Sequence, residues 1–286
     1  MSRLSEEETR DLFLAACRAE LHALKPGNVH VHAGGHGMEL RQFEASAEAA
    51  APCIAARRAK VGERILRAVE ATLAVAGCNT NLGILLLSVP LAAAAQAPPT
   101  GGLRDRVGRV LASLDDEDAA AVFEAIRRAN PGGLGLVPDQ DVAARPTVGL
   151  LQAMALAADR DRIARAYVTD FKEVFEFGLP ALERARRQSA DMAFMVTTLH
   201  MAYLAEAPDS HIARKFGDAA AEQVRGEARR LKAQWDPVAP PTFEALLAFD
   251  AELKGRSLNP GTTADFVVAT LFAASICCRL GMSSPA

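Results

Sequence analysis

The chain has 286 residues, of which 50% are apolar but only 5% are aromatic, and its formal net charge is −3. Alanine dominates the apolar share, which favours closely packed helices over sheets rich in β-branched and aromatic side chains. Acidic and basic residues are mixed along the sequence, so no broad basic face is offered to nucleic acid or to an anionic membrane surface. The composition therefore predicts an all-α protein and leaves open a small anionic ligand, which needs only a local cluster of cations.

The N-terminus, the cysteines and the most apolar stretch indicate the compartment. The N-terminal segment is acidic and lacks the basic-then-apolar layout of a secretory signal. The five cysteines form no CxxC pair, which indicates reduced thiols and no redox cofactor. The apolar stretch from Leu82 to Ala95 is shorter than a membrane span and contains Pro90, so we expect a buried core helix. Together these features predict a soluble, cytoplasmic protein without membrane attachment.

Helical periodicity covers most of the first half of the chain. Ser5 and Glu8 have the spacing of a capping box, and apolar residues then recur at helical intervals to about Leu24. The glycine-rich segment 28–37 predicts an ordered loop. The further helices expected here are 40–56, 61–76, 82–95, 103–114 and 116–129, followed by a loop at 130–146.

The second half also has the pattern of one helix after another. Breaks are expected near 159 and at 178–180, 208–210, 235–241 and 258–261. No strand-like alternation, fixed repeat or composition break interrupts the pattern. We therefore predict one large multi-helix bundle, with residues 1–286 as a single domain whose polar loops form one nucleotide cleft. Alanine-rich helices often carry a dimer face, so a homodimer is a further expectation that the pattern alone does not separate from a buried core.

Three expected helix starts carry small polar residues, at 77–81, 208–217 and 259–265. The first and the last precede apolar helices, where free backbone N–H groups and the helix dipole favour phosphate. The same positions also suit ordinary N-caps, with Asn81 and Thr262 as the caps and a carboxylate three residues after Thr262. In the middle segment cationic residues follow the start, which suits an anion site as well as a solvated helix.

Three histidines, His30, His32 and His36, stand close together in the glycine-rich loop. An H-x-H pair with a third histidine can supply imidazole ligands to a metal. No cysteine pair, H-E-x-x-H motif or acidic cluster at ligand spacing accompanies them, so hydrogen bonding within the loop or contact with a substrate is the preferred interpretation. The phosphate loop G-x-x-x-x-G-K-[ST], the dinucleotide motif G-x-G-x-x-G and the nucleophile elbow G-x-S-x-G are absent.

Four short segments, taken in order, carry a resemblance to a known family. Lys25-Pro-Gly-Asn-Val is followed by 77–83 (Gly-Cys-Asn-Thr-Asn-Leu-Gly), by 209–217 and by 258–265 (Leu-Asn-Pro-Gly-Thr-Thr-Ala-Asp). This order resembles the triphosphoribosyl-dephospho-CoA synthase family, with its K-P-G-L-V-D start, G-x-N-T-H-K-G and D-T-N-x-x-x-R-G-G blocks and L-S-P-G-G-S-A-D-L end. The matched blocks span about Ala19 to Ile276, which is nearly the whole chain.

The resemblance implies a transferase reaction. In that family the 2′-hydroxyl of dephospho-CoA attacks the ribose C1 of ATP, adenine leaves, and the triphosphate stays on the transferred sugar. ATP and dephospho-CoA, or a related hydroxyl acceptor, are therefore the expected small-molecule partners. Such chemistry needs a base for the hydroxyl, an acid for adenine and cations for the triphosphate. Mg²⁺ held by carboxylate and amide oxygens suits the triphosphate better than a histidine-bound metal.

Lys25, Asn79, Asp209, Asn259, Gly261, Thr262 and Asp265 fall on motif positions of the family, and Asp250 matches its acidic residue before the last block. With polar neighbours in the same segments added as a hypothesis, they give a set of candidate site residues. The catalytic candidates are Asp209, Asp250 and Asp265, of which Asp209 and Asp265 are also the candidate Mg²⁺ ligands. The candidate nucleotide and phosphate ligands are Lys25, Gly27, His36, Asn79, Thr80, Asn81, Ser210, Arg214, Lys215, Asn259, Gly261 and Thr262.

The chain departs from the family pattern at several positions. Asn81 and Leu82 replace the His-Lys of N-T-H-K-G, and Gly35-His-Gly-Met38 lacks the aspartate of G-A-H-x-D-M unless Glu39 substitutes for it. The middle R-G-E-A motif is absent from its place, and the same letters at 225–228 fit a chance match on a solvated helix. Three alternatives follow: a related phosphoribosyl transfer in another cofactor pathway, such as methanopterin or methanofuran synthesis; a helical Mg²⁺-dependent nucleotide or ADP-ribosyl hydrolase; and a non-catalytic helical scaffold.

Overall fold

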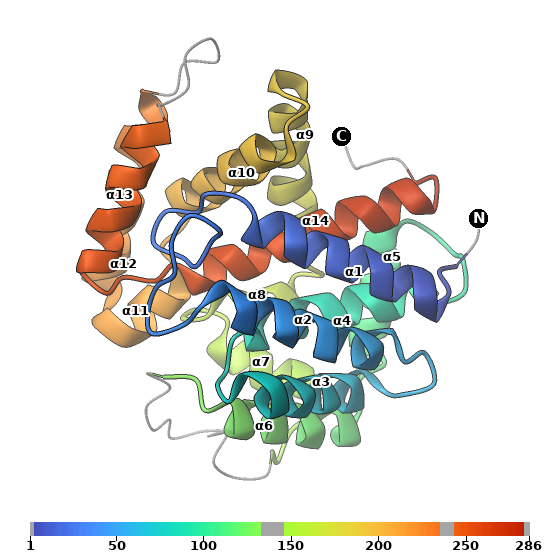
Figure 1. The fold of residues 1–286 in the computed structure, drawn as a ribbon. Coiled ribbons are helices and arrows are strands. Elements are labelled where there is room, and N and C mark those ends of the chain that lie inside the picture. The colour runs from blue at the N-terminus through green and yellow to red at the C-terminus, as the bar shows by residue number, and fades with distance from the viewer. Residues whose placement is uncertain (1–2, 133–145, 235–242, 283–286) are drawn as a thin grey trace.

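The computed structural model describes residues 3–132, 146–234 and 243–282, and every regular element within them is a helix (Figure 1). The all-α prediction is therefore confirmed. The first half forms α1 (Glu6–Leu21), α2 (Leu40–Ala55), α3 (Val61–Ala76), α4 (Leu82–Gln96), α5 (Leu103–Ala112) and α6 (Asp116–Ala129). The second half forms α7 (Leu150–Ala157), α8 (Arg162–Val168), the π-helix η1 (Glu173–Gly178), α9 (Leu179–Gln188), α10 (Met192–Glu206), α11 (Ser210–Phe216), α12 (Asp218–Ala233), α13 (Phe243–Gly255) and α14 (Gly261–Arg279).

The boundaries of the early helices follow local signals in the sequence. Ser5 caps α1 through the reciprocal hydrogen bonds of a capping box with Glu8, as its spacing predicts. Gly77 ends α3 in the left-handed conformation, with φ at 69°, which glycine adopts without strain. Helix α1 ends at Leu21, earlier than the expected Leu24. The early end lets the chain turn so that the side chain of Lys25 reaches back to the helix.

The expected break at 178–180 is wrong. The π-helix η1 runs directly into α9, and Pro180 is the second residue of α9, so the chain stays helical across Gly178 and Pro180. A break that the sequence did not suggest occurs at Gly217, where φ is 87° and α11 gives way to α12. The loop expected at 130–146 and the break expected at 235–241 lie largely or wholly outside the described residues.

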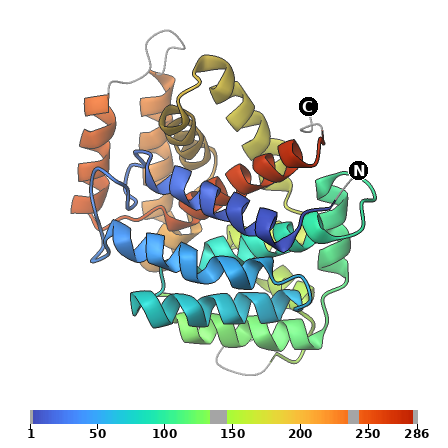
Figure 2. The same ribbon diagram turned by 45° about the vertical axis from the view of Figure 1, so that its right-hand side comes forward.

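Helix α14 is the centre around which the other helices pack. It contacts α1, α4 and α10, while α2, α3 and α6 extend the stack on the side of α1 and α4 (Figures 1 and 2). Within the described ranges, α14 is the helix long and apolar enough to cross a membrane, but 72% of that stretch is buried inside the protein. Helix α14 is therefore a core helix of the folded protein. The apolar α4 is likewise buried along almost its entire length, as expected for it.

The apolar interior has two parts that share elements. The larger cluster is formed by α1 to α10 and α14, and the smaller one gathers α11, α12 and α13, which lie together in both ribbon views. Helix α10 contributes Leu199 to the larger cluster and Leu204 to the smaller one. One helix therefore packs in both clusters and links them, and the single domain stays a prediction.

Candidate active site

A cavity of about 850 Å³ opens among segments that are far apart in the sequence. The 26–38 loop, the N-terminal ends of α4 and α14, and α11 supply its polar lining. Helices α6 and α7 supply an apolar wall that includes Phe123, Ile126, Met154 and Leu156. One end of the cavity is thus rich in amides and charges, and the other is suited to apolar groups.

The cavity brings together most of the candidate residues named from the sequence. Those that line it are His36, Asn79, Thr80, Asn81, Arg214, Lys215, Asn259, Gly261, Thr262 and Asp265. The remaining candidates, Lys25, Gly27, Asp209, Ser210 and Asp250, lie behind this lining and hold it in place through hydrogen bonds.

The start of α4 carries amides with distinct partners. Asn79 Oδ1 caps the helix by accepting from Leu82 N at 3.1 Å, whereas Asn81 Oδ1 accepts from Thr72 Oγ1 at 3.1 Å. Asn81 is only 5% exposed, and its Nδ2 has no hydrogen-bond partner among the described residues. A buried donor without a partner is costly, so the amide of Asn81 is suited to a ligand acceptor. Asn81 is therefore not the side chain that caps the helix.

Asp265, on the first turns of α14, lies against the start of α4. A Cβ on Gly83 would overlap its carboxylate, coming within 2.5 Å of Cγ, so glycine is needed for this approach. The carboxylate has no hydrogen bond or ion pair within the described part of the chain, and it does not cap α14. Burial, together with the charges of Asp209 and Glu20, raises the pKa of Asp265 well above its usual value. The cavity therefore contains a carboxyl group whose charge no neighbouring cation pairs with.

Asp209 joins two helices. Its Oδ1 caps α11 by accepting from His211 N at 2.9 Å and Ile212 N at 3.1 Å, and its Oδ2 accepts from Thr263 N at 2.7 Å. The next residue, Ser210, donates through Oγ to Thr262 Oγ1 at 3.1 Å, so Thr262 is not a cap either. Asp209 is 1% exposed, and three backbone N–H groups occupy its oxygens.

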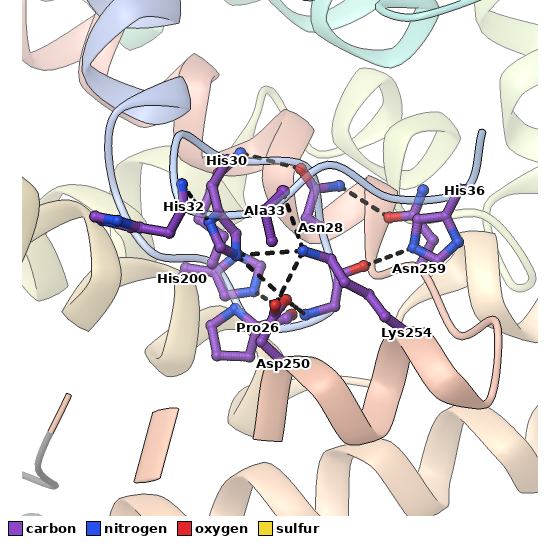
Figure 3. A network of polar contacts seen from close by, with 12 residues as sticks. Pro26, Asn28, His30, His32, Ala33, His36, His200, Asp250, Lys254 and Asn259 are labelled. Carbon is purple, nitrogen blue, oxygen red and sulfur yellow. Dashed lines mark hydrogen bonds and ion pairs between the residues drawn. The ribbon is translucent and has the colours of Figure 1, made fainter. Parts of the chain in front are cut away.

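The 26–38 loop is held from behind by two helices (Figure 3). Asp250 on α13 accepts from Gly27 N at 2.9 Å and pairs with Lys254 at 3.0 Å and with His30 at 3.3 Å. His200 on α10 donates through Nε2 to the Pro26 carbonyl at 3.2 Å. These contacts fix the loop so that its far end faces the cavity.

Two side chains of the same loop face the polar end of the cavity. His36 Nε2 donates to the Gly27 carbonyl at 2.8 Å, and Asn28 Nδ2 donates to Asn259 Oδ1 at 2.9 Å (Figure 3). His30, in contrast, turns to Asp250 and accepts from His32 N at 3.2 Å. The loop histidines therefore make different hydrogen bonds, and no group of three metal-ligating side chains is found in the part of the chain that the structure describes.

Lys25 forms a buried ion pair with Glu20 of α1. Its Nζ also donates to Asn28 Oδ1 at 3.0 Å, and its side chain is 0% exposed. Burial lowers the pKa of Lys25 and raises that of Glu20, while the attraction within the pair acts against both shifts. Lys25 does not reach the cavity, but both of its partners line it.

Comparison with known proteins identifies the family of this chain. The sequence profile of the ATP:dephospho-CoA triphosphoribosyl transferase family matches residues 6–284. The chain belongs to this family. The resemblance read from the motifs is thus confirmed, and with it membership in a family of transferases.

Curated and solved relatives agree with this assignment. A 2-(5''-triphosphoribosyl)-3'-dephosphocoenzyme-A synthase of Klebsiella pneumoniae is 27% identical over 94% of this chain and 91% of its own length. A protein of the same description from Escherichia fergusonii is 33% identical over 36% of this chain and 34% of its own length. A crystal structure from Archaeoglobus fulgidus, described as a triphosphoribosyl-dephospho-CoA synthase, superposes with a TM-score of 0.63 at 27% identity, covering 80% of this chain and 96% of that one.

The structure shows where the residues that depart from the family motifs lie in this transferase. Asn81 lines the cavity, and Leu82, which replaces a cation, is 8% exposed beside it. Glu39 precedes α2 and lies outside the cavity lining. The letters at 225–228 lie on α12, where Glu227 pairs with Arg256 at 2.9 Å, also outside the lining. The altered pair at the start of α4, Asn81 and Leu82, therefore lines the cavity.

Four cationic side chains, Arg128, Arg160, Arg214 and Lys215, line the cavity of this transferase. Arg214 pairs with Asp161 at 3.1 Å, and Arg128 pairs with Glu70 and Glu124. Arg160 donates to the Leu156 carbonyl at 3.2 Å, and no carboxylate pairs with it or with Lys215 among the described residues. These two side chains keep their charge available for an anion.

Several lining residues escaped the sequence reading. They are Glu20, Asn28, Arg128, Arg160 and Asp161. His211, which lies in the segment considered for an anion site, also lines the cavity. Burial lowers the pKa of His211 to about 4, and its Nε2 has no partner among the described residues. Asn28 follows the matched Lys-Pro-Gly and could have been found there. Glu20 gave no signal, because a lone glutamate in an amphipathic helix has the pattern of a solvated residue.

Proposed function

We propose that this transferase moves the 5-triphosphoribosyl group of ATP onto a hydroxyl group of dephospho-CoA and releases adenine. The observation that carries the proposal is the meeting of the four matched segments at one cavity. A relative that matches 94% of the chain is named for this product. The cavity also offers the amides, cations and unpaired carboxyl group that the reaction needs.

The triphosphate is assigned to the cationic end of the cavity. Arg160, Arg214 and Lys215 offer positive charge there, and the unpartnered amide of Asn81 offers a donor. Phosphate oxygens accept strongly from such groups. The apolar wall on α6 and α7, which includes Phe123 and Met154, is assigned to adenine and to the apolar arm of the acceptor.

The reaction exchanges one bond at the ribose C1 carbon. A bond forms between this carbon and the acceptor oxygen while its bond to adenine N9 breaks, and the electron pair leaves with adenine. Positive charge develops on the sugar in such a transition state, and a nearby carboxylate stabilises it. Asp265 lies at the cavity without a protein counter-ion and is suited to this position.

Mg²⁺ fits the same carboxyl group. Asp209 does not fit, since three backbone N–H groups occupy its oxygens, whereas Asp265 has oxygens free. Mg²⁺ is commonly held by one or two carboxylates together with substrate phosphates and water, so one side chain suffices. When bound, the ion would supply positive charge to the triphosphate oxygens. Asp265 is accordingly the proposed ligand, and Asp209 and Asp250 are proposed as residues that position the lining.

Acceptor-dependent release of adenine tests the proposal. The protein is incubated with ATP and Mg²⁺, with and without dephospho-CoA, and adenine is measured by chromatography while mass spectrometry follows the acceptor. We expect adenine only when the acceptor is present, with one triphosphoribosyl group added to it. Replacement of Mg²⁺ by a chelator should reduce the rate at least tenfold.

Other outcomes would replace the proposal. Adenine release that does not depend on the acceptor indicates a hydrolase, and release only with another hydroxyl compound indicates a transferase of a different cofactor pathway. Phosphate release without adenine contradicts the proposed bond cleavage. A chain that binds no ATP would be a scaffold.

We also place the reaction in the cytoplasm. All five cysteines are free thiols, which supports a reducing compartment.

A further inference from the structure

Glu20 and Asp265 are two of the four carboxyl groups that line the cavity, together with Asp161 and Asp218. Asp265 of α14 has no counter-ion among the described residues, whereas Glu20 of α1 is paired with Lys25. Glu20 is 3% exposed and lines the cavity through the end of α1. The two groups are near enough that the charge of Glu20 contributes to the raised pKa of Asp265.

The pair with Lys25 leaves one oxygen of Glu20 free. Lys25 Nζ binds Oε1, and Oε2 has no hydrogen-bond partner in the ranges that the structure describes. Lys25 itself is immobile, because its Nζ also donates to Asn28 and Asn28 donates to Asn259. These contacts orient the Glu20 carboxylate through its pairing with Lys25.

The surroundings of Glu20 give it the properties of a base. A buried carboxylate is poorly solvated and takes up a proton more readily than an exposed one, yet an adjacent ammonium group keeps it ionised beforehand. The other carboxylates near the cavity are less suited. Asp209 and Asp250 have their oxygens occupied behind the lining, and Asp161 caps α8 and pairs with Arg214. Asp218 is exposed and well solvated.

We propose that Glu20 is the base that accepts the proton of the attacking acceptor hydroxyl, and that Lys25 is the residue that positions it. This inference rests on the function proposed above. As the acceptor oxygen bonds to the ribose C1, its proton passes to Glu20 Oε2, and the C1–N9 electron pair stays on adenine. Adenine takes a proton from water in the open cavity, and Glu20 later returns its proton to water, so charge and protons balance.

Glu20→Gln tests the role because it keeps the shape and the contact to Lys25 but cannot accept the proton. We expect kcat to fall by about 10² to 10⁴. The KM for ATP and its affinity by calorimetry should stay within about threefold, since the base acts on the acceptor. Glu20→Asp retains a carboxylate and should recover part of the rate.

The pH profile separates a base from a structural residue. The groups that face Glu20 are Lys25, Asp265 and the thiol of Cys17, whose pKa burial raises well above its usual value, so it stays neutral. Burial raises the pKa of both Glu20 and Asp265, so the wild-type rate should fall on the acid side as these two carboxylates take up protons. E20Q removes the contribution of Glu20 and leaves that of Asp265, so the acid limb should become shallower. In Lys25→Met the loss of the ammonium favours the neutral carboxyl, so the limb should move to higher pH.

The outcomes are distinguishable. If the wild-type protein releases adenine with dephospho-CoA, the proposed function stands. The E20Q variant then tests only whether Glu20 is the base. An E20Q rate equal to wild type, an unchanged acid limb, or a loss confined to ATP binding would each overturn the assignment. Should E20Q not fold, the double variant E20Q/K25M removes both buried charges together and takes its place. A folded double variant with an unchanged limb also overturns the proposal.

Discussion

Gly83 is the residue at which α4 and α14 approach most closely beside the cavity. The Asp265 carboxylate occupies the space that a side chain at this position would need. The backbone at Gly83, near the start of α4, has no unusual angle that would require glycine. The glycine is therefore needed for the close contact between the two helices. The absence of one methyl group allows the carboxylate to rest against the positive end of a buried helix.

Replacing Gly83 by alanine should displace Asp265. We expect kcat to fall about 10²-fold, because a shift of about 1 Å at a reacting group costs this much, and stability to fall by about 1–3 kcal/mol through overpacking. The matched control is Gly226→Ala on α12, where the nearest neighbouring atom to a Cβ is the Arg230 guanidinium at 3.7 Å. The control should keep full activity and gain up to about 1 kcal/mol of stability. Steady-state kinetics and urea unfolding measure both, and a fully active G83A would show that Asp265 is not held there.

The site residues divide into those that a sequence reveals and those that it does not. Motif order identified Asn79, Asn81, Thr262 and Asp265, all of which line the cavity. It could not separate them from Asp250, which looks equally functional but faces away, because that difference depends on how α13 packs against the loop. Local composition does not encode such long-range packing.

Asp209 shows how one side chain sets the relation between two elements. It caps α11 and also binds the first turn of α14, so the same carboxylate fixes the angle at which the two helix starts meet. Helix α11 has only seven residues and gains little stability from its own hydrogen bonds. Its place at the cavity therefore depends on this contact.

Asp209→Ala should destabilise the protein by about 3 kcal/mol, because three buried N–H groups lose their acceptor. The control is Asp191→Ala, which removes an exposed cap that accepts only from Ala193 N. That change should cost about 1 kcal/mol. Urea unfolding with the slope held constant measures the difference. Equal losses for the two variants would contradict the bridging role of Asp209.

The positions of the helices were more predictable from the sequence than the way in which consecutive helices connect. Periodicity located α3 and α6 at their observed bounds, since an amphipathic stripe is a local property of the sequence. The continuation of η1 into α9 was missed because proline in a first turn reads as a break unless its place in the helix is known. The split between α11 and α12 at Gly217 was missed for a related reason: a single glycine within a helical pattern is usually tolerated.

At the scale of the whole molecule, the two apolar clusters are joined by elements that pass through both. Helix α10 packs in each, and Ala23 and Leu24, adjacent in the chain, face different clusters. Lys25 then links this turn to α1. If α11, α12 and α13 separated from the rest of the protein, these contacts would break and the buried ion pair between Lys25 and Glu20 would be exposed.

Unfolding should consequently be one cooperative transition. Differential scanning calorimetry should give a calorimetric enthalpy close to the van't Hoff enthalpy. ATP with Mg²⁺ in hundredfold excess over its dissociation constant should raise the stability by about 2.7 kcal/mol without splitting the peak. Two separate transitions would contradict the single-domain organisation.

Helix α7 is the lightly anchored wall of the cavity. Only Leu150 and Met154 are buried along it, and Leu156 is 51% exposed. Substitutions here cost little folding free energy, whereas those on α4 or α14 disturb the centre of the molecule. If α7 contacts the acceptor as proposed, changes in this one helix can alter the choice of acceptor while the residues on α4 and α14 are kept.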